Sequence, residues 1–253
     1  MSKKFPRVAI VTGATSGIGE ATAKKFIDSG FGIVGSGRNQ SRLEMMEKKF
    51  KPNFSAVVGD AADEVVLDRL FSMAAERFGQ PADIVVVNAG RGLGGSVKDA
   101  DLSELEEMIQ VNVTAALKLM QWAARNMEDR QKSRFPDAAA DIVVIGSVAG
   151  RHVSEFSTVY GASKAAVHAL TEGLRRELSS SGVRVSLVEP GACLTGFQSS
   201  AGYGDDTIQT MVEQFGPLLD VIDIANTIHY IISQPPQVHL CNAVVRPTRM
   251  NYP

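Results

Sequence analysis

The sequence predicts an α/β protein built on one doubly wound parallel sheet of about seven strands, with helices on both faces. Short runs rich in Val and Ile alternate with helical patterns along the whole chain, which is typical of right-handed βαβ units. The runs "RVAIVT", "DIVVVN" and "DIVVIG" are almost continuously apolar instead of alternating. Such runs are expected of strands that are covered on both faces.

Each expected strand is a short apolar run bounded by glycine, proline or polar residues. The expected strands are Arg7–Thr12, Gly32–Ser36, Phe54–Gly59, Asp83–Val87, Asp141–Gly146, Val183–Glu189 and Val238–Val245. Between them, apolar residues recur at helical spacing. The expected helices are Gly17–Asp28, Ser41–Phe50, Asp63–Phe78, Leu102–Met127, Thr158–Ser180 and Val221–Ser233.

Two segments interrupt this alternation. Residues 126–140 are polar and contain Pro136, so we expect a surface loop there. Residues 191–217 are rich in Gly and Ser, and a long connection inside a compact domain is usually functional. We therefore expect residues 191–219 to cover a substrate. No repeat or linker divides the chain, and residues 1–253 are expected to form one domain.

The composition excludes several classes of protein. The formal net charge at pH 7 is −2, so nothing points to nucleic acid or to an anionic membrane as a partner. No apolar run approaches the roughly 18 residues of a membrane span, and the run Val8–Val11 is too short for a signal peptide. Cys193, Cys241 and four scattered histidines lack metal-ligand spacing. We expect a cytoplasmic protein with reduced thiols and without a metal.

A glycine-rich turn follows the first strand. Gly13, Gly17 and Gly19 in "VAIVTGATSGIGEATAKKF" have the spacing G-x-x-x-G-x-G. Glycine lets the backbone turn sharply and approach a pyrophosphate, whose charge then meets the first N–H groups of a helix. Taken alone, the stretch has a plain tight strand-to-helix turn as its alternative.

Further motifs follow this turn in a fixed order. They are Asn88-Ala89-Gly90, Asn112, Ser147, Tyr160-x-x-x-Lys164 and Pro190-Gly191. Over nearly the whole chain, their order and spacing resemble the short-chain dehydrogenases/reductases. The resemblance implies a Rossmann-like fold, a nicotinamide cofactor and the catalytic residues Asn112, Ser147, Tyr160 and Lys164. It also implies that the cofactor contacts Gly13, Thr15, Ser16, Gly17, Ile18, Gly19, Arg38, Asp60, Ala61, Asn88, Ala89, Gly90, Tyr160, Lys164, Pro190, Gly191 and Thr195.

The end of the second strand bears on the choice of cofactor. An acidic residue there usually binds the ribose 2′-hydroxyl, whereas an Arg suits a 2′-phosphate. Gly37 stands at the acidic position and Arg38 follows it. Because a charge-assisted contact is worth about 1.5–3 kcal/mol, we expect NADP(H) rather than NAD(H). The alternative is that Arg38 is a solvated loop residue.

Asp60 follows the third strand. The resemblance implies that its carboxylate accepts a hydrogen bond from the adenine amino group. The alternative is a helix N-cap, for which Asp63 is better placed. Val87 stands where the family usually has a first Asn before Asn88, and we expect Val87 to pack in the core.

Tyr160 and Lys164 are four residues apart and share one face of a predicted helix. A free phenol has a pKa of about 10, whereas a general acid works best near the operating pH. One cation at about 4 Å supplies about 4 kcal/mol at an effective dielectric constant near 20, enough to lower a pKa by about 3. Our hypothesis is that Tyr160 donates a proton to a carbonyl oxygen and that Lys164 lowers its pKa. The resemblance adds that Lys164 also bonds the nicotinamide ribose.

Ser147 ends a predicted strand, where its hydroxyl can donate to a substrate oxygen as negative charge develops. Gly146 replaces the Ser that usually precedes it in the family. For Asn112, the resemblance implies a kink in the helix and a bound water that leads to the lysine. The alternatives are a capping hydroxyl for Ser147 and a satisfied core amide for Asn112.

The substrate is expected to be a mid-sized aldehyde or ketone under an apolar cover. The apolar side chains expected in this cover are Phe197, Tyr203, Met211 and Phe215. By resemblance, Pro190-Gly191 packs against the nicotinamide and Thr195 bonds its carboxamide. Arg91, and Arg151 with His152, are candidates for binding a carboxylate or phosphate, with solvated rim charges as the commoner alternative.

The sequence therefore predicts an NADP(H)-dependent oxidoreductase that transfers a hydride between the nicotinamide and a carbonyl or secondary alcohol. One alternative is a non-catalytic NADP-binding redox sensor or scaffold, but such a protein would be expected to lose Tyr160, Lys164 or Ser147, and this chain keeps all three. The other alternative is a methyltransferase, which has no use for Tyr-x-x-x-Lys.

Small residues form a stripe on the helix that carries Tyr160, namely Ala162, Ala166, Ala169 and Gly173. The resemblance implies a homotetramer or homodimer that assembles through this helix and the long helix before it.

Overall fold

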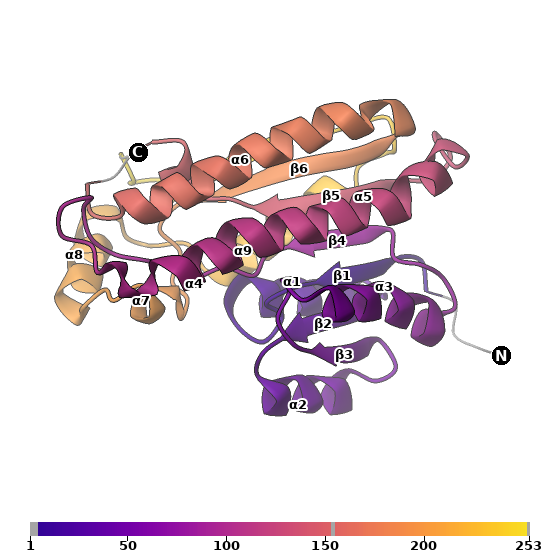
Figure 1. Cartoon of the computed structure of the whole chain (residues 1–253), viewed down its shortest axis with the longest axis horizontal. Helices are drawn as coiled ribbons and strands as arrows, with labels where there is room; N and C mark the ends of the chain where they lie inside the picture. Colours follow the sequence, from indigo (N-terminus) through magenta and orange to yellow (C-terminus); the bar gives the residue numbers. More distant parts are fainter. Residues whose placement is uncertain (1–4, 153–154, 252–253) are drawn as a thin grey trace.

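The computed structural model describes residues 5–152 and 155–251, so the ends of the expected domain, residues 1–4 and 252–253, lie outside the described residues. Within the described residues, seven parallel strands form one sheet in the order β3-β2-β1-β4-β5-β6-β7 (Figure 1). The strands are β1 (Val8–Val11), β2 (Gly32–Gly37), β3 (Phe54–Val58), β4 (Ile84–Val87), β5 (Ala140–Ile145), β6 (Val183–Pro190) and β7 (Asn242–Val245). The strand order reverses between β1 and β4. In such sheets the ligand crevice lies beyond the carboxyl ends of the strands at this reversal.

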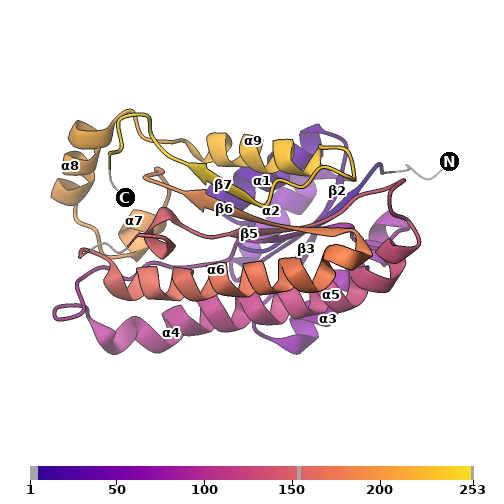
Figure 2. The same cartoon turned by 90° about the horizontal axis from the view of Figure 1, so that it is seen from above.

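Helices cover both faces of the sheet (Figure 2). One face carries α1 (Gly17–Asp28), α2 (Gln40–Phe50) and α9 (Val221–Ile232), and the other carries α3 (Glu64–Phe78), α5 (Ala116–Lys132) and α6 (Thr158–Leu178). Alternate residues of β1 belong to the two hydrophobic cores, one on each face of the sheet. Val8 and Ile10 lie in one core, and Ala9 and Val11 lie in the other. This double burial explains the continuous apolar runs in the sequence. Val87 packs in the core as expected.

The expected helix over Leu102–Met127 consists of several pieces. It starts with a 3₁₀ turn, η1 (Leu102–Glu104), and continues through α4 (Leu105–Ile109), the π-helical segment η2 (Gln110–Ala115) and α5. Helix α5 extends to Lys132, five residues beyond the expected end. It does so because Gln131 is buried and its amide donates to the Ala138 carbonyl oxygen at 2.6 Å. The first part of the expected 126–140 loop is therefore helical.

Two other expectations about chain segments also differ from the structure. Strand β7 begins at Asn242 rather than Val238, since the carbonyl oxygen of Val238 accepts from the Arg184 guanidinium at 2.9 Å. Residues 191–217 are partly helical, with α7 (Phe197–Ser200) and α8 (Asp205–Phe215). Two acidic residues in the first turn of α8 favour its start. The remaining short elements are η3 (Val148–Gly150) and η4 (Ser179–Ser181).

Buried ion pairs fix the amino-terminal edge of the sheet. Asp141 at the start of β5 lies 2.7 Å from both Arg7 and Arg184, and Arg7 also contacts Asp83. The four residues precede or begin β1, β4, β5 and β6, so each pair joins strands that are distant in sequence. A buried charge that lost its partner would be costly. The charges at this edge are thus structural, and the opposite, carboxyl edge is left for a ligand.

Candidate active site

The glycine turn is held against the end of β4. Thr12 Oγ1 accepts from the backbone N–H groups of Asn88 and Ala89 at 3.1 and 3.2 Å, and Asn88 Nδ2 donates to the Thr12 carbonyl at 2.9 Å. Gly13 has φ +63°, and a Cβ on Gly19 would lie 2.3 Å from the Gly13 carbonyl oxygen. The turn therefore requires glycine at both positions, for conformation at Gly13 and for space at Gly19.

This turn fits the pyrophosphate of a dinucleotide. Ser16, Gly17 and Ile18 at the start of α1 line a cleft of about 1650 Å³ at the carboxyl edge of the sheet. The first helical hydrogen bond runs from Glu20 N–H to the Ser16 carbonyl. The N–H groups before Glu20 are thus left at the positive end of the helix dipole, where an anion binds well.

The same cleft brings together most of the residues expected at the site. Side chains or backbone from the ends of β1, β4, β5 and β6 line it. The expected residues along it are Gly13, Ser16, Gly17, Ile18, Asn88, Ala89, Gly90, Ser147, Tyr160, Lys164, Pro190, Gly191 and Thr195. Gly19 and Asn112 are buried behind this lining.

Four expected cofactor residues lie beyond the lining of the cleft, at the ends of β2 and β3. Thr15 packs against Gly37, where a Cβ would lie 2.9 Å from Thr15 Cγ2. Asp60 is exposed and its Oδ1 accepts from Ala62 N–H at 2.8 Å, with Ala61 between them. Arg38 is 69% exposed, and its guanidinium pairs with Glu107 at 2.9 Å. These positions suit the adenosine half of a dinucleotide, but Arg38 already has a counter-ion.

Tyr160 is almost completely buried beside Ser147. Its side chain hydrogen-bonds that of Ser147, and its ring packs on Phe197 with centroids 5.2 Å apart. Burial raises the pKa of the Tyr160 phenol well above its usual 10, and the Ser147 hydrogen bond lowers it by less. The expected lowering of this pKa by Lys164 is therefore not met, because desolvation of the phenolate dominates. The phenol is protonated at neutral pH.

Lys164 is also buried and points across the end of β5. Its Nζ donates to the Ile145 carbonyl at 2.8 Å and lies 6.0 Å from the centroid of the Tyr160 ring. Burial lowers the pKa of Lys164 to about 8, since a low-dielectric environment disfavours the ammonium. The ammonium thus lies near the Tyr160 ring but is not packed against it.

Asn112 lies in the π-helical segment η2, an irregularity in the helix at the residue for which the resemblance implied a kink. Its Oδ1 accepts from Arg91 N–H at 2.8 Å, while its Nδ2 donates to the Arg91 carbonyl at 2.9 Å and to Ser163 Oγ at 3.0 Å. A Cβ on Gly90 would lie 3.3 Å from Asn112 Oδ1 and 3.6 Å from Lys164 Nζ. Asn112 is therefore a satisfied buried amide that fixes the loop after β4 beside Lys164.

The outer wall of the cleft comes from the segment after β6. Phe197, Tyr203, Met211 and Phe215 all line it, so the expected apolar residues do face the cleft. Thr195 lies beside Gly17 and its Oγ1 accepts from Phe197 N–H at 3.0 Å. Cys193 also lines the cleft, and burial raises the pKa of its thiol to about 12. It is therefore a neutral, weakly polar wall residue.

The arginines suggested for substrate binding are placed differently from each other. Arg91 lines the cleft but pairs with Glu104 and Glu107. Arg151 instead lines a separate cavity and forms a bidentate pair with Glu189, while His152 is exposed and outside the lining of the cleft. Arg91 and Arg151 therefore do not face the same cavity, and a carboxylate pairs with each of them.

Sequence reasoning missed two titratable residues behind Ser147, the partly buried His168 and the fully buried Glu189. His168 Nε2 accepts from the backbone N–H of Ser147 at 3.3 Å, and His168 Nδ1 lies 3.8 Å from the fully buried Glu189. A signal was available, since Tyr160, Lys164 and His168 recur at four-residue intervals and so share one face of α6. Acidic residues of the cleft rim, Asp99 and Glu155, were also missed.

The described residues limit other kinds of site. In residues 5–152 and 155–251, no group of three or more His, Cys, Asp or Glu side chains is arranged to hold a metal ion. None of the helices in these ranges is both long and apolar enough to cross a membrane.

Comparison with known proteins agrees with this fold and site. A family model for short chain dehydrogenases matches residues 7–205. The chain therefore belongs to the short-chain dehydrogenase/reductase family of oxidoreductases. An uncharacterised oxidoreductase from Staphylococcus epidermidis is 31% identical over 247 residues, which cover 98% of this chain and 100% of the relative. One from Staphylococcus saprophyticus is 34% identical over 245 residues, covering 95% and 97%.

Solved structures of this family are also similar. The closed form of a serine dehydrogenase complexed with NADP+ superposes with a TM-score of 0.86 and 28% identity, covering 97% of this chain and 96% of that one. Serine dehydrogenase from Escherichia coli gives a TM-score of 0.80 and 26% identity, covering 97% and 100%. A nicotinamide cofactor thus agrees with both the cleft and the similar structures.

Proposed function

We propose that the protein reduces a carbonyl compound at the expense of NADPH, with Tyr160 as the proton donor. The observation that carries this proposal is the convergence of Ser147, Tyr160 and Lys164 in the cleft beyond the glycine turn. When bound, the reduced nicotinamide would supply the hydride. The chain supplies the proton, the stabilisation of developing charge and the exclusion of water.

The protonation state of Tyr160 favours the reductive direction. A phenol with its ordinary pKa of about 10 is protonated at neutral pH, and burial raises the pKa of Tyr160 further. An alkoxide formed from the substrate carbonyl is more basic than a phenolate, so transfer of the proton to it is downhill. In this proposal, Ser147 Oγ donates to the same oxygen as its negative charge grows.

We propose that the adenosine half lies across Thr15, Arg38, Asp60 and Ala61, with the 2′-phosphate at Arg38. An arginine suits this phosphate and a carboxylate would repel it. Glu107 holds the Arg38 guanidinium at 2.9 Å, so phosphate binding must compete with this pair. Glu107 therefore reduces the affinity that Arg38 gives.

Two substitutions test this assignment. Arg38→Ala is expected to weaken NADPH binding about tenfold. This is the lower end of the range for a charge-assisted contact, because Arg38 is exposed to solvent. Glu107→Gln is expected to strengthen NADPH binding by removing the competing carboxylate. Fluorescence titration measures both, with NADH as the control ligand whose affinity stays unchanged. Unaltered NADPH affinity in Arg38→Ala would exclude the proposed contact.

The substrate is proposed to be a mid-sized aldehyde or ketone. The cleft beside Tyr160 is walled by Phe197, Tyr203, Met211 and Phe215, which favours an apolar body next to the carbonyl. The test is NADPH oxidation at 340 nm against aldehydes, ketones, quinones and keto acids, with serine and other 3-hydroxy acids in the reverse direction. Turnover with none of these compounds would contradict the proposal.

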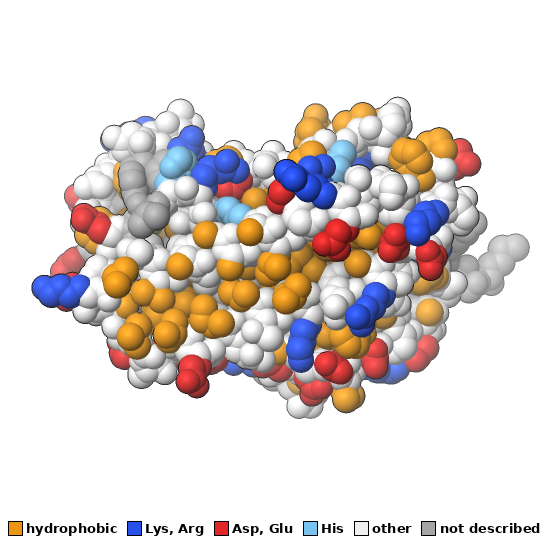
Figure 3. Space-filling view, turned by 45° about the horizontal axis from the view of Figure 1, so that its top comes forward, with side chains coloured by type: hydrophobic (Ala, Val, Ile, Leu, Met, Phe, Trp, Pro, Cys, Tyr) orange, Lys and Arg blue, Asp and Glu red, His pale blue; other side chains and the backbone are white. Residues whose placement is uncertain are grey.

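We also propose that the protein is a homodimer or homotetramer that assembles through α5 and α6. Apolar side chains gather on the face that these helices present (Figure 3). Ala162, Ala165 and Ala169 on α6 and Leu117 on α5 are exposed there, and a Cβ on Gly173 would meet nothing within 4 Å. The small-residue stripe of α6 thus faces away from the sheet and permits close approach of a second helix.

Light scattering at micromolar concentration is expected to give a dimer or tetramer. Ala169→Arg is expected to shift the mass toward the monomer, because a long charged side chain would be buried at the contact. Lys24→Arg, on the other face of the molecule, is the matched control. A monomeric wild-type protein would refute this assembly.

A further inference from the structure

The side chain of His168 fills the space directly behind the catalytic serine. A Cβ on Gly146 would lie 2.4 Å from His168 Nε2, and a Cβ on Gly150 would lie 2.8 Å from His168 Cε1. The imidazole can take this position only because both residues are glycine. The imidazole therefore occupies the space that a side chain at residue 146 would need.

The hydrogen bonds of His168 define its protonation state. The backbone N–H of Ser147 points at Nε2 from 3.3 Å, so Nε2 must be the unprotonated, accepting nitrogen. The proton of the neutral ring then lies on Nδ1, which faces Glu189 Oε2 at 3.8 Å. Glu189 is fully buried on β6 and is paired with Arg151. The acidic residue thus favours the tautomer that Ser147 requires.

From these contacts we propose that His168 is a positioning residue for Ser147. The neutral imidazole accepts a hydrogen bond from the Ser147 backbone N–H, and the protonated imidazole releases it. Turnover therefore falls at acid pH. The inference rests on the function proposed above. Its physical basis is that His168 Nε2 changes from a hydrogen-bond acceptor to a donor when the imidazole is protonated. A protonated Nε2 is a donor, and two donors that face each other at 3.3 Å repel.

The groups around His168 determine the pH at which this occurs. Burial lowers the pKa of His168 below its ordinary 6.5 and outweighs the attraction of Glu189, while Lys164 and Arg151 lower it further. Glu172, one turn along α6, is paired with Arg175 and Arg176. The imidazole is therefore neutral at neutral pH, and its hydrogen bond from the Ser147 backbone N–H is formed at that pH.

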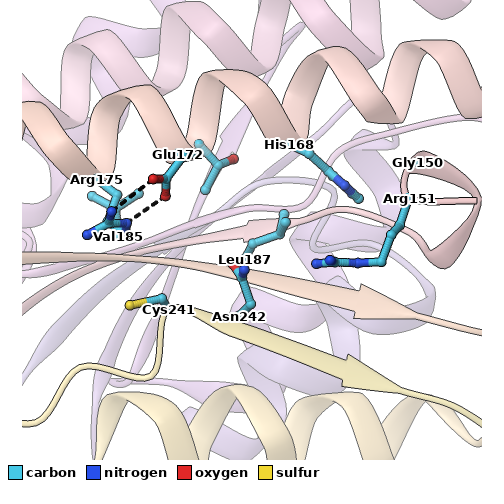
Figure 4. Close-up of a pocket in the computed structure, with 10 residues that line it drawn as sticks. Gly150, Arg151, His168, Glu172, Arg175, Val185, Leu187, Cys241 and Asn242 are labelled. Atoms are coloured by element: carbon cyan, nitrogen blue, oxygen red, sulfur yellow. Dashed lines mark hydrogen bonds and ion pairs between the residues drawn. The ribbon is translucent and has the colours of Figure 1, made fainter.

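Protons can reach His168 without passing through the substrate cleft. A second cavity of about 320 Å³ lies between α6 and the strands β6 and β7, and His168, Gly150 and Arg151 line it. In Figure 4, His168 and Arg151 lie at the same end of this cavity, away from the Glu172–Arg175 pair. The ionisation of His168 can therefore follow the pH of the solvent when substrate and cofactor occupy the main cleft.

The first test is independent of any substrate. In ¹⁵N-labelled protein, the amide resonance of Ser147 is expected to titrate together with the imidazole of His168, at a pH below 6.5. His168→Gln keeps an acceptor but cannot titrate, so it is expected to leave the Ser147 amide independent of pH in this range. A Ser147 amide that does not follow His168 in the wild-type protein would overturn the proposal, whether or not a substrate is known.

The second test uses turnover with an accepted carbonyl substrate. The wild-type kcat is expected to fall as pH decreases through the pKa of His168, whereas His168→Gln keeps near-neutral activity and loses this acid limb. His168→Leu, which removes the acceptor, is expected to have a kcat about tenfold below that of the wild type at neutral pH and to lack the acid limb, while NADPH affinity is unchanged. Gly146→Ala, whose Cβ would displace the ring, should reproduce the His168→Leu result.

His229→Gln is the matched control, because His229 lies on α9 and contacts Ser29 instead. It is expected to keep the wild-type profile. An acid limb that persists unchanged in His168→Gln would overturn the proposal. Absence of turnover with every carbonyl compound would count against the proposed function alone, because the titration of the Ser147 amide still decides the role of His168.

Discussion

Tyr160→Phe is expected to lower kcat for carbonyl reduction by about 100- to 10,000-fold, the usual contribution of a positioned general acid. The substitution removes the only atom of the side chain that can give a proton and leaves the ring that packs on Phe197. The affinity for NADPH is expected to change little. Steady-state kinetics and fluorescence titration of the nucleotide measure the two quantities separately.

The matched control for this substitution is Tyr230→Phe, at a position on α9 that is 61% exposed. It should have wild-type kinetics. Circular dichroism would verify that Tyr160→Phe is folded. Near-wild-type turnover by a folded Tyr160→Phe protein would show that the proton comes from elsewhere, and the assignment of Tyr160 would be wrong.

Lys164→Met is expected to lower kcat by about 100- to 1,000-fold, comparable with the loss of one preorganised electrostatic contact. Methionine has a similar length but neither charge nor donor, so the contact with the Ile145 carbonyl disappears. The apparent KM for NADPH should also rise, since the resemblance places Lys164 at the nicotinamide ribose. Lys132→Met, at the exposed end of α5, is the control and should leave both parameters unchanged.

The same substitution should change how stability depends on pH. The pKa of Lys164 is about 8 in the folded protein against an ordinary 10.5, so between these values the unfolded chain binds more protons. The free energy of unfolding of the wild-type protein should therefore rise with pH over this range, by about 3 kcal/mol relative to Lys164→Met. Urea denaturation near pH 7 and pH 10.5 measures this difference. If the difference in the free energy of unfolding between the wild-type protein and Lys164→Met is the same at both pH values, Lys164 titrates normally.

Much of the fold could be predicted from local patterns. The continuous apolar strands and the helical spacing between them give the parallel sheet, because each pattern follows from the geometry of a few neighbouring residues. The glycine spacing places the turn after β1, and the four-residue interval places Tyr160 and Lys164 on one helical face. Errors fell at segment ends, such as residues 126–132 of α5, where the buried Gln131 prolongs the helix through a contact beyond it.

Much of the electrostatics could not be predicted in the same way. Arg38 has a counter-ion 69 residues away in sequence, Glu107, and no spacing rule connects two such positions. The pKa of Tyr160 depends on how completely the chain covers the phenol, and the burial found here reverses the expected direction of the shift. The role of His168 depends equally on Gly146, Glu189 and the end of β5.

The sequence by itself determined the sheet, the glycine turn, the order of the motifs and the family, since these depend on residue type and on spacing along the chain. Only the tertiary structure decided which charges are paired and which titratable groups are buried. It also showed that an imidazole stands behind Ser147. Charge–charge energies and desolvation depend on distances through space and on the exclusion of water, and the folded chain sets both by joining segments that lie far apart in sequence.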